Sequence, residues 1–515
     1  MRSTSTSQIL VPMIVACALF MQNLDSTIVA TALPAIADSL HEQPLRLNLA
    51  ITSYLLSLAV FIPLSGWMAD RFGARTVFCT AIAVFTLGSA GCGQAHNLPE
   101  LIASRILQGM GGAMMVPVGR LVLLRTVPKA QLVRALAFLS LPAMIGPVIG
   151  PPLGGFIVTY SSWRWIFYIN LPIGVAAVLM TRMFIFDPPY LRRVSTRIDS
   201  WGIGFLALGI GSLQIMLDKG QEDDWFGSRF ITWLAILTVL GLGAFIIREL
   251  MAENPVVHLR VFKNRTYASG TALMTMLGFV LYGSLVALPI FIQTLLGYPP
   301  AKAGMALAPR GLGSFCGMPL VGVVIGKIDA RKLLVVGLLG STVSLVELSH
   351  LNLNAGYWDL FWPQFFQGLF LSMLFVPLTT VTMDPIPREE MGNATSLLNL
   401  MRNIGGSVGI ATATTMVART SQTFQNTFVR HINPNNPVAM AQLQHFQSYF
   451  QSRGADPVTA MKKAYAAVYG IVQQQAALLS YLNIFKFFGY VFLLMLPLLF
   501  LMKRPARADR PTAMH

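Results

Sequence analysis

One apolar stretch decides the fold, namely Gly146-Pro147-Val148-Ile149-Gly150-Pro151-Pro152-Leu153-Gly154-Gly155. It lies in a run without a charged residue from Ala135 to Ser162. Its glycines at 146, 150 and 154 recur every fourth residue, so on a helix they share one face that carries no side chains. In a membrane, another helix can pack against such a face at backbone contact, and prolines are tolerated there. The stretch therefore predicts a membrane-spanning helix packed closely on a second helix.

The composition of the whole chain is that of a polytopic membrane protein. Of its 515 residues, 54% are apolar and 11% are charged, whereas a soluble protein carries about 25% charged residues. Apolar runs of about 20 residues recur between short polar connectors, and each is long enough to cross a bilayer as a helix. We expect an all-α membrane protein with 14 transmembrane helices at residues 11–37, 47–67, 77–94, 99–123, 135–158, 165–185, 201–217, 229–249, 268–294, 303–325, 332–350, 360–382, 394–417 and 482–502.

The net charge of +16 follows the topology that these spans impose. If the N-terminus is cytoplasmic, the cytoplasmic segments and span ends hold 22 of the 37 Lys and Arg residues, and the short external loops hold five. This asymmetry is the positive-inside rule, and it places both termini in the cytoplasm. It explains the basic character better than nucleic-acid binding does.

A charged pair is expected inside the membrane. Asp25 lies in the middle of the first span, where a carboxylate costs about 2.5–3.5 kcal/mol. One interpretation is a carboxylate that takes up and releases protons. The alternative is a helix-packing residue that Asn23, Ser26 or Thr27 satisfies. Arg105 in the fourth span is always charged, so it must face the bundle interior or water, and Asp25 is its natural partner.

The connector Gly66–Arg75 is expected to be a tight cytoplasmic turn. Gly66 and Gly73 give the backbone freedom, and the charges of Asp70, Arg71 and Arg75 stand where two helix ends meet. The alternative is a solvated basic loop that serves topology alone.

Together these stretches resemble the signatures of the major facilitator superfamily. The connector Gly66–Arg75 is similar to its loop signature, and Arg105-x-x-Gln108-Gly109 is similar to its span-4 signature. The stretch Gly146–Gly155 resembles the span-5 antiporter signature, which is found in exporters and generally lacking in importers. The stretches Leu24–Ile28 and Trp163–Pro172 resemble those of the fourteen-span drug:proton antiporters.

Two further stretches narrow the resemblance to a subtype. Ile210–Asp218 and Glu253–Val257 look like the EmrB-type multidrug efflux subunits. The likeness implies proton-coupled efflux of hydrophobic drugs and other lipophilic toxic compounds across the bacterial inner membrane. It implies alternating access of two six-helix bundles, driven by the proton gradient without a cofactor. The bundles would comprise residues 1–190 and 266–502, with two inserted helices at 191–265 and a basic cytoplasmic tail at 503–515.

The resemblance also implies roles for the residues singled out above. Asp25 and Arg105 would couple the proton, which competes with substrate for a central cavity. The switch loop would comprise Gly66, Asp70, Arg71, Gly73 and Arg75. The interface between the bundles would be sealed by the antiporter motif Gly146, Pro147, Gly150, Pro151, Gly154 and Gly155. The substrate cavity would be lined by Gln22, Asn23, Gln108 and Arg310.

The second half repeats the first half in an eroded form. The loop signature survives only as Gly322–Arg331, with altered spacing. Arg310 follows Pro309 in the tenth span, and it would either attract anionic substrates or pair with Glu347 or with backbone carbonyls. Glu347 and Asp384 lie near span ends, so an interfacial position is expected for them rather than a role in coupling.

The segment 418–481 is the one large external feature. Its stretches 438–452 and 457–481 begin just after a proline and have helical composition. We expect a helical hairpin whose second arm runs into the last span, although a solvated tether is the alternative. Resemblance to the EmrB-type pumps implies that a periplasmic adaptor protein docks there, and through it an outer-membrane channel.

Other functional classes fit the sequence less well. Its four cysteines have no paired spacing, and no metal site, nucleotide loop or nucleophile with a base is evident, so no enzyme activity is expected. Two alternatives remain, an exporter of one metabolite, lipid or siderophore, and a non-transporting membrane sensor or scaffold. Such a scaffold could lose Asp25 and Arg105 without penalty, and their joint presence argues against it.

Overall fold

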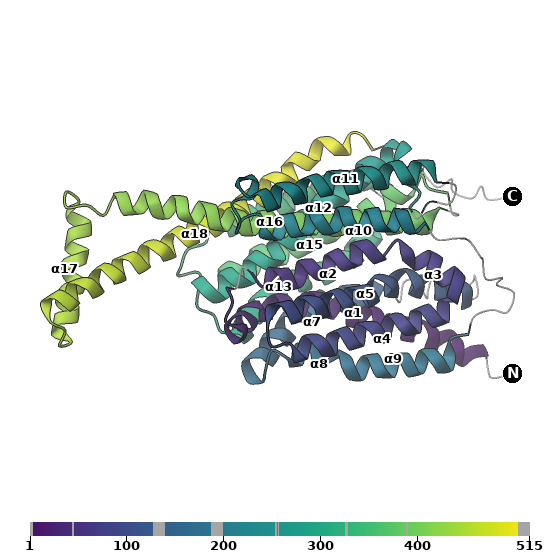
Figure 1. Ribbon diagram of the computed structural model, residues 1–515, viewed down its shortest axis with the longest axis horizontal. Helices are drawn as coiled ribbons and strands as arrows, with labels where there is room; N and C mark the ends of the chain where they lie inside the picture. Colours follow the sequence, from purple (N-terminus) through teal and green to yellow (C-terminus); the bar gives the residue numbers. More distant parts are fainter. Residues whose placement is uncertain are drawn as a thin grey trace.

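The computed structural model describes residues 4–502 except 44–45, 127–139, 187–198, 253–254, 256, 325–327 and 388–389, and it contains helices but no strand in this part of the chain. The expected basic tail 503–515 lies outside the described residues. The helices are α1 (Thr4–Leu40), α2 (Asn48–Phe61), α3 (Leu64–Phe72), α4 (Ala74–Gln94), α5 (Leu98–Thr126), α7 (Ser140–Tyr160), α8 (Trp165–Tyr168), α9 (Asn170–Phe184), α10 (Ser200–Lys219), α11 (Arg229–Met251), α12 (Arg265–Ile290), α13 (Pro300–Val324), α14 (Ala330–Leu348), α15 (Tyr357–Met383), α16 (Met391–Arg430), α17 (Pro437–Ser452) and α18 (Pro457–Leu499), with short turns at Trp225–Gly227, Leu259–Lys263 and Phe291–Leu295 (Figure 1).

Where the structure describes them, the 14 expected spans each coincide with a helix or with a helix that is briefly broken. Residues 135–139 of the fifth span and residue 325 of the tenth lie outside the described residues. In the described part of the chain, ten helical segments are long and apolar enough to cross a membrane by themselves. The remaining expected spans are α2, α7, α14 and α16, which pack among these ten. The second span is interrupted before Leu64, where Pro63 precedes the short helix α3.

The helices form two bundles and a separate pair. In the first bundle α4 packs on α5, α2 on α5, and α1 on α7 and α9. In the second bundle α12 packs on α16, α13 on α15, and α18 on α14 and α16. The bundles meet along α7 with α13 and along α2 with α16. The pair α10 and α11 rests on this second seam, because α10 contacts both α2 and α16. This confirms the expected major facilitator arrangement with one inserted pair.

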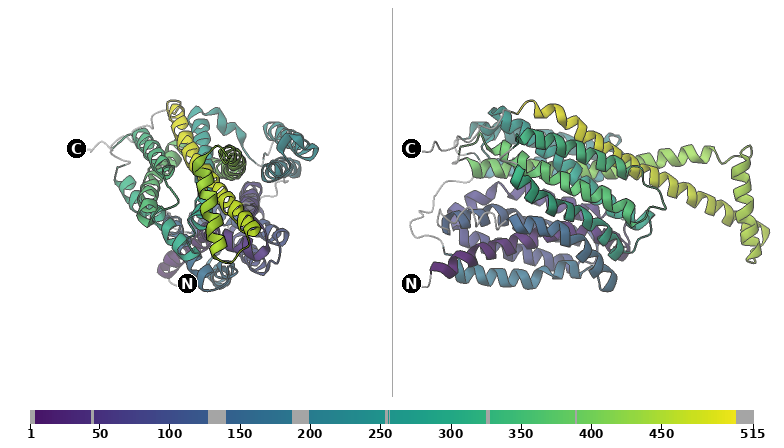
Figure 2. Two further views of the ribbon diagram at one scale, coloured as in Figure 1. Left: turned by 90° about the vertical axis from the view of Figure 1, so that its left-hand side faces the viewer. Right: turned by 180° about the vertical axis from the view of Figure 1, so that it is seen from behind.

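The two ends of the molecule differ. The start of α1 and the end of α18 lie at one end, here called the terminal end, and α17 projects from the opposite end, here called the α17 end (Figure 1). Figure 2 shows the bundle along the helix axes from the α17 end and again from behind.

The projection at the α17 end is longer than the sequence predicts. The thirteenth span was expected to end at residue 417, but α16 continues without a break to Arg430. The expected hairpin follows as α17 and α18, and α18 runs on into the last span. Asp456 caps α18 by accepting hydrogen bonds from the backbone amides of Val458 and Thr459. Hydrogen bonds from the Thr459 side chain and from these amides lower the pKa of Asp456.

Candidate functional site

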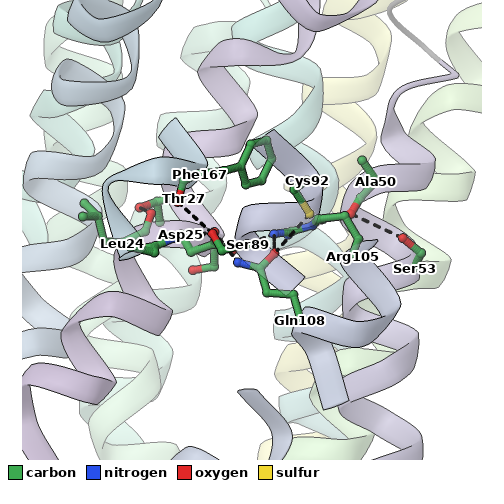
Figure 3. A network of polar contacts seen from close by, with 12 residues as sticks. Leu24, Asp25, Thr27, Ala50, Ser53, Ser89, Cys92, Arg105, Gln108 and Phe167 are labelled. Carbon is green, nitrogen blue, oxygen red and sulfur yellow. Dashed lines mark hydrogen bonds and ion pairs between the residues drawn. The ribbon is translucent and has the colours of Figure 1, made fainter. Parts of the chain in front are cut away.

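The carboxylate of Asp25 lies in a buried ionic cluster between α1 and α5 (Figure 3). Arg105 Nη1 donates a hydrogen bond to Asp25 Oδ2 at 2.6 Å and another to Gln108 Oε1 at 2.7 Å. Gln108 Nε2 donates to Asp25 Oδ1 at 2.8 Å. None of the three residues is more than 1% exposed. The expected pairing of Arg105 with Asp25 is therefore present, and Gln108 braces it.

Other helices of the first bundle complete the cluster. Asn170 Nδ2, at the start of α9, donates to Asp25 Oδ1 at 3.1 Å and to Ser89 Oγ of α4 at 3.0 Å. Arg105 Nε donates to the Ala50 carbonyl of α2 at 2.9 Å, and its guanidinium carbon lies 4.3 Å from the centroid of the Tyr54 ring. Five helices, α1, α2, α4, α5 and α9, thus contribute to one site.

The chemistry of the cluster follows from its burial. The two formal charges cancel, and every hydrogen bond to Asp25 comes from Arg105, Gln108 or Asn170. The hydroxyls of Ser26 and Thr27 donate to backbone carbonyls instead, so they do not satisfy Asp25 as the alternative interpretation required. Breaking a buried pair by removing one partner costs about 3–5 kcal/mol, because the other charge is left alone. The pair is stable only as long as both groups stay charged.

The sequence analysis missed Asn170, Ser89 and Tyr54. Asn170 lies in the stretch Trp163–Pro172 that carried the family resemblance, and it is fully buried. The signal in the sequence was the amide side chain of Asn170 at the start of an otherwise apolar span, which indicates a buried polar contact. Nothing in the sequence indicates that it faces Asp25, because the rotation of each helix is set by packing.

The glycine ladder of α7 packs against α1. A Cβ atom on Gly146 would lie 3.0 Å from Cβ of Asn23, and Cβ atoms on Gly150 and Gly154 would overlap the hydroxyls of Thr27 and Thr31. Thr27 Oγ1 also lies 3.3 Å from the carbonyl of Gly146. The ladder therefore matches a series of α1 residues spaced by four, and the predicted close helix contact is confirmed.

The antiporter motif contacts both bundles. Three of its glycines face α1 inside the first bundle. Gly155 faces the second bundle, where its Cβ would overlap the Pro300 carbonyl of α13, and a seal between the bundles stays a prediction. In return, Gly304 of α13 packs on the Pro151 carbonyl. Residues spaced by four lie on one face of a helix, so the glycines at 146, 150 and 154 can pack closely against one neighbouring helix only. The side chain of Pro147 lies outside the described part.

A cavity of about 270 Å³ lies between the two bundles. It is lined by polar residues of α1 and by the arginines of the second bundle, including Asn23, Thr27, Tyr282, Ser314, Arg310 and Arg402. Of the predicted cavity residues, Asn23 and Arg310 line it, whereas Gln22 and Gln108 are not among its lining residues. Gln108 lies instead in the ionic cluster.

Asp25 is also not among the residues that line this cavity. Asn23 and Thr27 face the cavity, and Asp25 faces Arg105 from another side of α1. In this conformation the ionic cluster and the cavity are separate, and competition of proton and substrate for one cavity stays a prediction. The two sites share the helix α1 rather than a common surface.

The acidic residues of the second half stand apart from both sites. Arg310 Nη2 donates to Ser284 Oγ at 3.1 Å and does not pair with Glu347. Glu347 is exposed beside His350 and Asp359 near the start of α15, at the α17 end. Asp384 is exposed at the C-terminal end of α15. Both lie at span ends, as the sequence predicts.

The connector Gly66–Arg75 is mostly helical and is not an open turn. Gly66 lies inside α3, where a Cβ atom would meet no neighbour within 4 Å, so its freedom is not used. The turn is made by Gly73 alone, whose φ of 91° favours glycine. Arg71 lies 6.0 Å from the centroid of the Trp67 ring, and Arg75 lies 5.3 Å from that of Phe186. The side chain of Asp70 lies outside the described part.

The sequence is similar to those of known membrane transporters over most of its length. The profile of the Major Facilitator Superfamily matches residues 15–410. The chain is 35% identical to the multidrug export protein EmrB of Escherichia coli (strain K12) over 489 residues, which is 95% of this chain and 94% of that protein. It is 39% identical over 411 residues to MdtD of Enterobacter sp. (strain 638), whose name assigns it to multidrug resistance, covering 78% of this chain and 84% of that protein.

Solved structures share the fold at low identity. A bacterial homolog of the human lysosomal transporter Spinster, in an inward-facing and occupied conformation, aligns with a TM-score of 0.62 and 15% identity over 100% of both chains. A D-xylose-proton symporter aligns with a TM-score of 0.60 and 14% identity over 79% of this chain and 90% of that chain.

Proposed function

Because the chain belongs to the major facilitator superfamily, we propose that this transporter exports lipophilic drugs in exchange for protons. The names of its relatives EmrB and MdtD support drug export. The buried pair of Asp25 and Arg105 is the observation that carries the proton coupling.

The paired geometry holds the charges of Asp25 and Arg105 against each other in a buried site. Protonation would remove the negative charge and leave Arg105 as a lone buried cation, at a cost of about 3–5 kcal/mol. A conformation in which water reaches the cluster escapes this cost, so it accepts the proton more readily. A ligand shifts a conformational equilibrium only when it prefers one state. The pair gives the proton such a preference.

The helix α1 connects this switch to the cavity. Asp25 holds one side of α1 to α5, and Asn23 and Thr27 on another side line the cavity. The ladder of α7 fixes the same helix at Asn23, Thr27 and Thr31. Movement of α1 on protonation would therefore change the cavity wall directly.

The cavity wall favours an amphipathic substrate. Leu277, Leu281 and Phe375 supply apolar surface, and Arg310 and Arg402 supply charge. An apolar pocket with a few polar groups is the usual form of a small-molecule site. Two cations on one wall favour lipophilic compounds that carry an anionic or hydrogen-bond-accepting group.

The proposed setting is the bacterial inner membrane. The terminal end would face the cytoplasm, in accord with the distribution of Lys and Arg, and the α17 end would face the periplasm. The projection formed by α17 and the outer parts of α16 and α18 would then dock a periplasmic adaptor, and through it an outer-membrane channel. The proton gradient is the energy source, so the mechanism uses no cofactor.

Transport by reconstituted protein tests the coupling. Proteoliposomes with an imposed pH gradient are assayed for accumulation of fixed-charge dyes, the cation tetraphenylphosphonium and the anion anilinonaphthalene sulfonate. Asp25→Asn should reduce gradient-driven accumulation at least tenfold, whereas Asp38→Asn, on the exposed end of the same helix, should leave it unchanged. Equal accumulation by wild type and Asp25→Asn would show that Asp25 is not the coupling site. No accumulation of any dye by the wild type would contradict export of lipophilic compounds and favour a single-substrate exporter.

Surface substitutions test the adaptor proposal. Tyr465 and Tyr469 are 53% and 48% exposed on the projecting part of α18, and Tyr490 is 52% exposed in its bundle part. Replacing Tyr465 and Tyr469 by Ser should reduce co-purification of an adaptor from the native host at least tenfold. Tyr490→Ser is the matched control and should have no effect. Undiminished recovery with the double variant would place the adaptor elsewhere.

A further inference from the structure

A second membrane carboxylate lies outside the ionic cluster. Asp218 is in the last turn of α10, near the α17 end. Gln214 Nε2, one turn earlier, lies 3.0 Å from Asp218 Oδ1 and 2.9 Å from Oδ2. Thr52 Oγ1 of α2 lies 3.4 Å from Asp218 Oδ2. Asp218 thus joins the inserted pair to the first bundle through neutral groups.

The surroundings of Asp218 differ from those of Asp25 in charge. Among the described residues no Lys, Arg or His forms an ion pair with Asp218. Helix α2 contributes no formal charge, and Tyr54 is its one titratable residue. Near the start of α2, Arg46 pairs with Glu222 at 2.7 Å and with Glu42 at 3.4 Å. The other charged groups on the elements that pack on α10 are Arg229, Arg248 and Glu249 of α11, Arg402, Arg419 and Arg430 of α16, and Lys219, Asp223 and Asp224 beside Asp218.

Two of these cations, Arg419 and Arg248, bind other partners. Arg419 binds Gln221 Oε1 at 3.1 Å and lies 3.9 Å from Asp224, and Arg248 binds Asp199 at 2.8 Å. Asp218 therefore lacks the guanidinium that neutralises Asp25. A proton can neutralise it without leaving a buried cation behind, which is the step that Arg105 makes costly at Asp25.

Thr52 is suited to both protonation states of this carboxyl group. A hydroxyl has one donor and two acceptor sites. It can donate to the carboxylate, or donate to the Asn48 carbonyl at 3.2 Å and accept from the carboxylic acid. Gln214 donates to the unprotonated oxygen in either case. Uptake of one proton from water at the α17 end thus exchanges one hydrogen bond for another.

Near Asp218 there are buried polar atoms that form no hydrogen bond with any described residue. Asn48, on the same face of α2 as Thr52, is 4% exposed, and neither its Oδ1 nor its Nδ2 has a hydrogen-bond partner in the structure. The face of α2 that carries Thr52 therefore holds an unpaired donor group and an unpaired acceptor one helical turn from the partner of Asp218.

We propose that Asp218, with Thr52 and Gln214, is a second proton-binding site that works at the seam between the inserted pair and the two bundles. The inference rests on the proposed proton-coupled export, and it raises the number of protons exchanged per substrate. The inserted pair then takes part in energy conversion and is more than a spacer between the bundles.

The number of coupled protons is measurable at steady state. Proteoliposomes carry a pH difference of one unit, their membrane potential is clamped at zero, and anilinonaphthalene sulfonate is the probe. Each coupled proton multiplies the attainable concentration ratio of the dye about tenfold per pH unit. Asp218→Asn should lower that ratio about tenfold while exchange of dye without a gradient continues. Asp218→Glu should restore the ratio, and Asp223→Asn, an exposed carboxylate five residues away, should keep the wild-type value.

The outcomes separate the two proposals. If the wild type concentrates the dye and Asp218→Asn reaches the same ratio more slowly, Asp218 has a structural role only and the inference is overturned. If Thr52→Val also leaves the ratio unchanged while Asp25→Asn abolishes it, the coupling belongs to the ionic cluster alone. A wild type that does not respond to the gradient would overturn the proposed function and this inference together. Loss of dye exchange in Asp218→Asn, with the ratio also lost in Asp218→Glu, would assign the residue to folding.

Discussion

Helices α5 and α15 occupy corresponding places in the two bundles, and they carry the same motif with different charge. Arg105-x-x-Gln108-Gly109 begins seven residues into α5, and Gln364-x-x-Gln367-Gly368 begins seven residues into α15. Arg105 Nε donates to the Ala50 carbonyl of α2, and Gln364 Nε2 donates to the Ala306 carbonyl of α13 at 3.3 Å. The second bundle thus holds an uncharged copy of the site.

The neighbouring helices repeat the match. Tyr54 and Arg310 each follow that carbonyl by four residues, and a Cβ on Gly109 or Gly368 would crowd their respective carbonyl oxygens. Val280 lies nine residues before Pro289, as Asp25 lies nine before Pro34, and both are fully buried. The packing frame is therefore shared, while the carboxylate has become valine.

The difference separates packing from coupling. The amide oxygen of Gln364 and both polar atoms of Gln367 have no hydrogen-bond partner among the described residues. The helices of the second bundle thus pack in the same way although no carboxylate satisfies these amides. Arg310 occupies the place of Tyr54 and lines the cavity. In this account the first bundle keeps its charges as a proton switch, and the second places a cation on the cavity wall.

The largest expected effect comes from removing Arg105, the cation of the buried ion pair in the first bundle. Arg105→Gln leaves Asp25 without a cation and should lower the free energy of unfolding by about 3–5 kcal/mol. Gln364→Ala loses a neutral hydrogen bond and should cost about 1–2 kcal/mol. Thermal unfolding of both variants in one detergent measures the contrast. Equal losses would mean that the pair is worth no more than its neutral copy.

Replacing both charges of the first bundle's site by neutral amides, as in the second bundle, should restore part of the free energy of unfolding that Arg105→Gln alone loses. In Asp25→Asn with Arg105→Gln no buried charge remains, so this variant should regain at least half of the loss caused by Arg105→Gln alone. The same unfolding assay applies. Additive losses would indicate that the two residues do not act as a pair.

Gly109 and Gly368, which occupy the same position of the motif in the two bundles, allow the helix packing of the bundles to be compared. Gly368→Ala would crowd the Arg310 carbonyl, and Gly109→Ala would place a methyl group 2.6 Å from Cβ of Ser57. Each should cost about 1–3 kcal/mol, with the Gly368 variant the worse. Gly204→Ala meets nothing within 4 Å and should be near neutral or slightly stabilising. Reversal of this order in thermal unfolding would undermine the described helix contacts.

The smallest expected effect concerns one serine hydroxyl in each bundle. Ser57 Oγ donates to the Ile106 carbonyl at 2.7 Å, and Ser314 Oγ donates to the Gly368 carbonyl at 3.0 Å. Replacing either by Ala should cost about 1 kcal/mol, and by similar amounts, because neither bond involves a charge. A loss above about 3 kcal/mol at Ser57 alone would tie it to the ionic cluster.

The sequence predicts the helices well and their rotation poorly. Apolar runs and the proline starts at 437 and 457 locate the spans and the projecting hairpin, because length and capping are local properties. The ladder of α7 predicts a close contact but not that α1 is its partner. The sequence analysis places the proton site and the substrate site in one cavity, because the side of α1 on which Asp25 lies depends on the packing of the whole bundle and cannot be read from the sequence. The QxxQG copy at Gln364 was visible in the sequence and would have shown the repeat.

The central claim is that the charged pair, absent from the second bundle, couples proton movement to transport. The most direct test loads proteoliposomes with anilinonaphthalene sulfonate and a trapped pH indicator, and follows proton movement as the dye leaves down its gradient. We predict that the wild type moves protons against the dye, and that the Asp25→Asn, Arg105→Gln variant releases dye through the protein while moving fewer protons per dye molecule than the wild type. Proton movement of wild-type size in that variant would contradict the account.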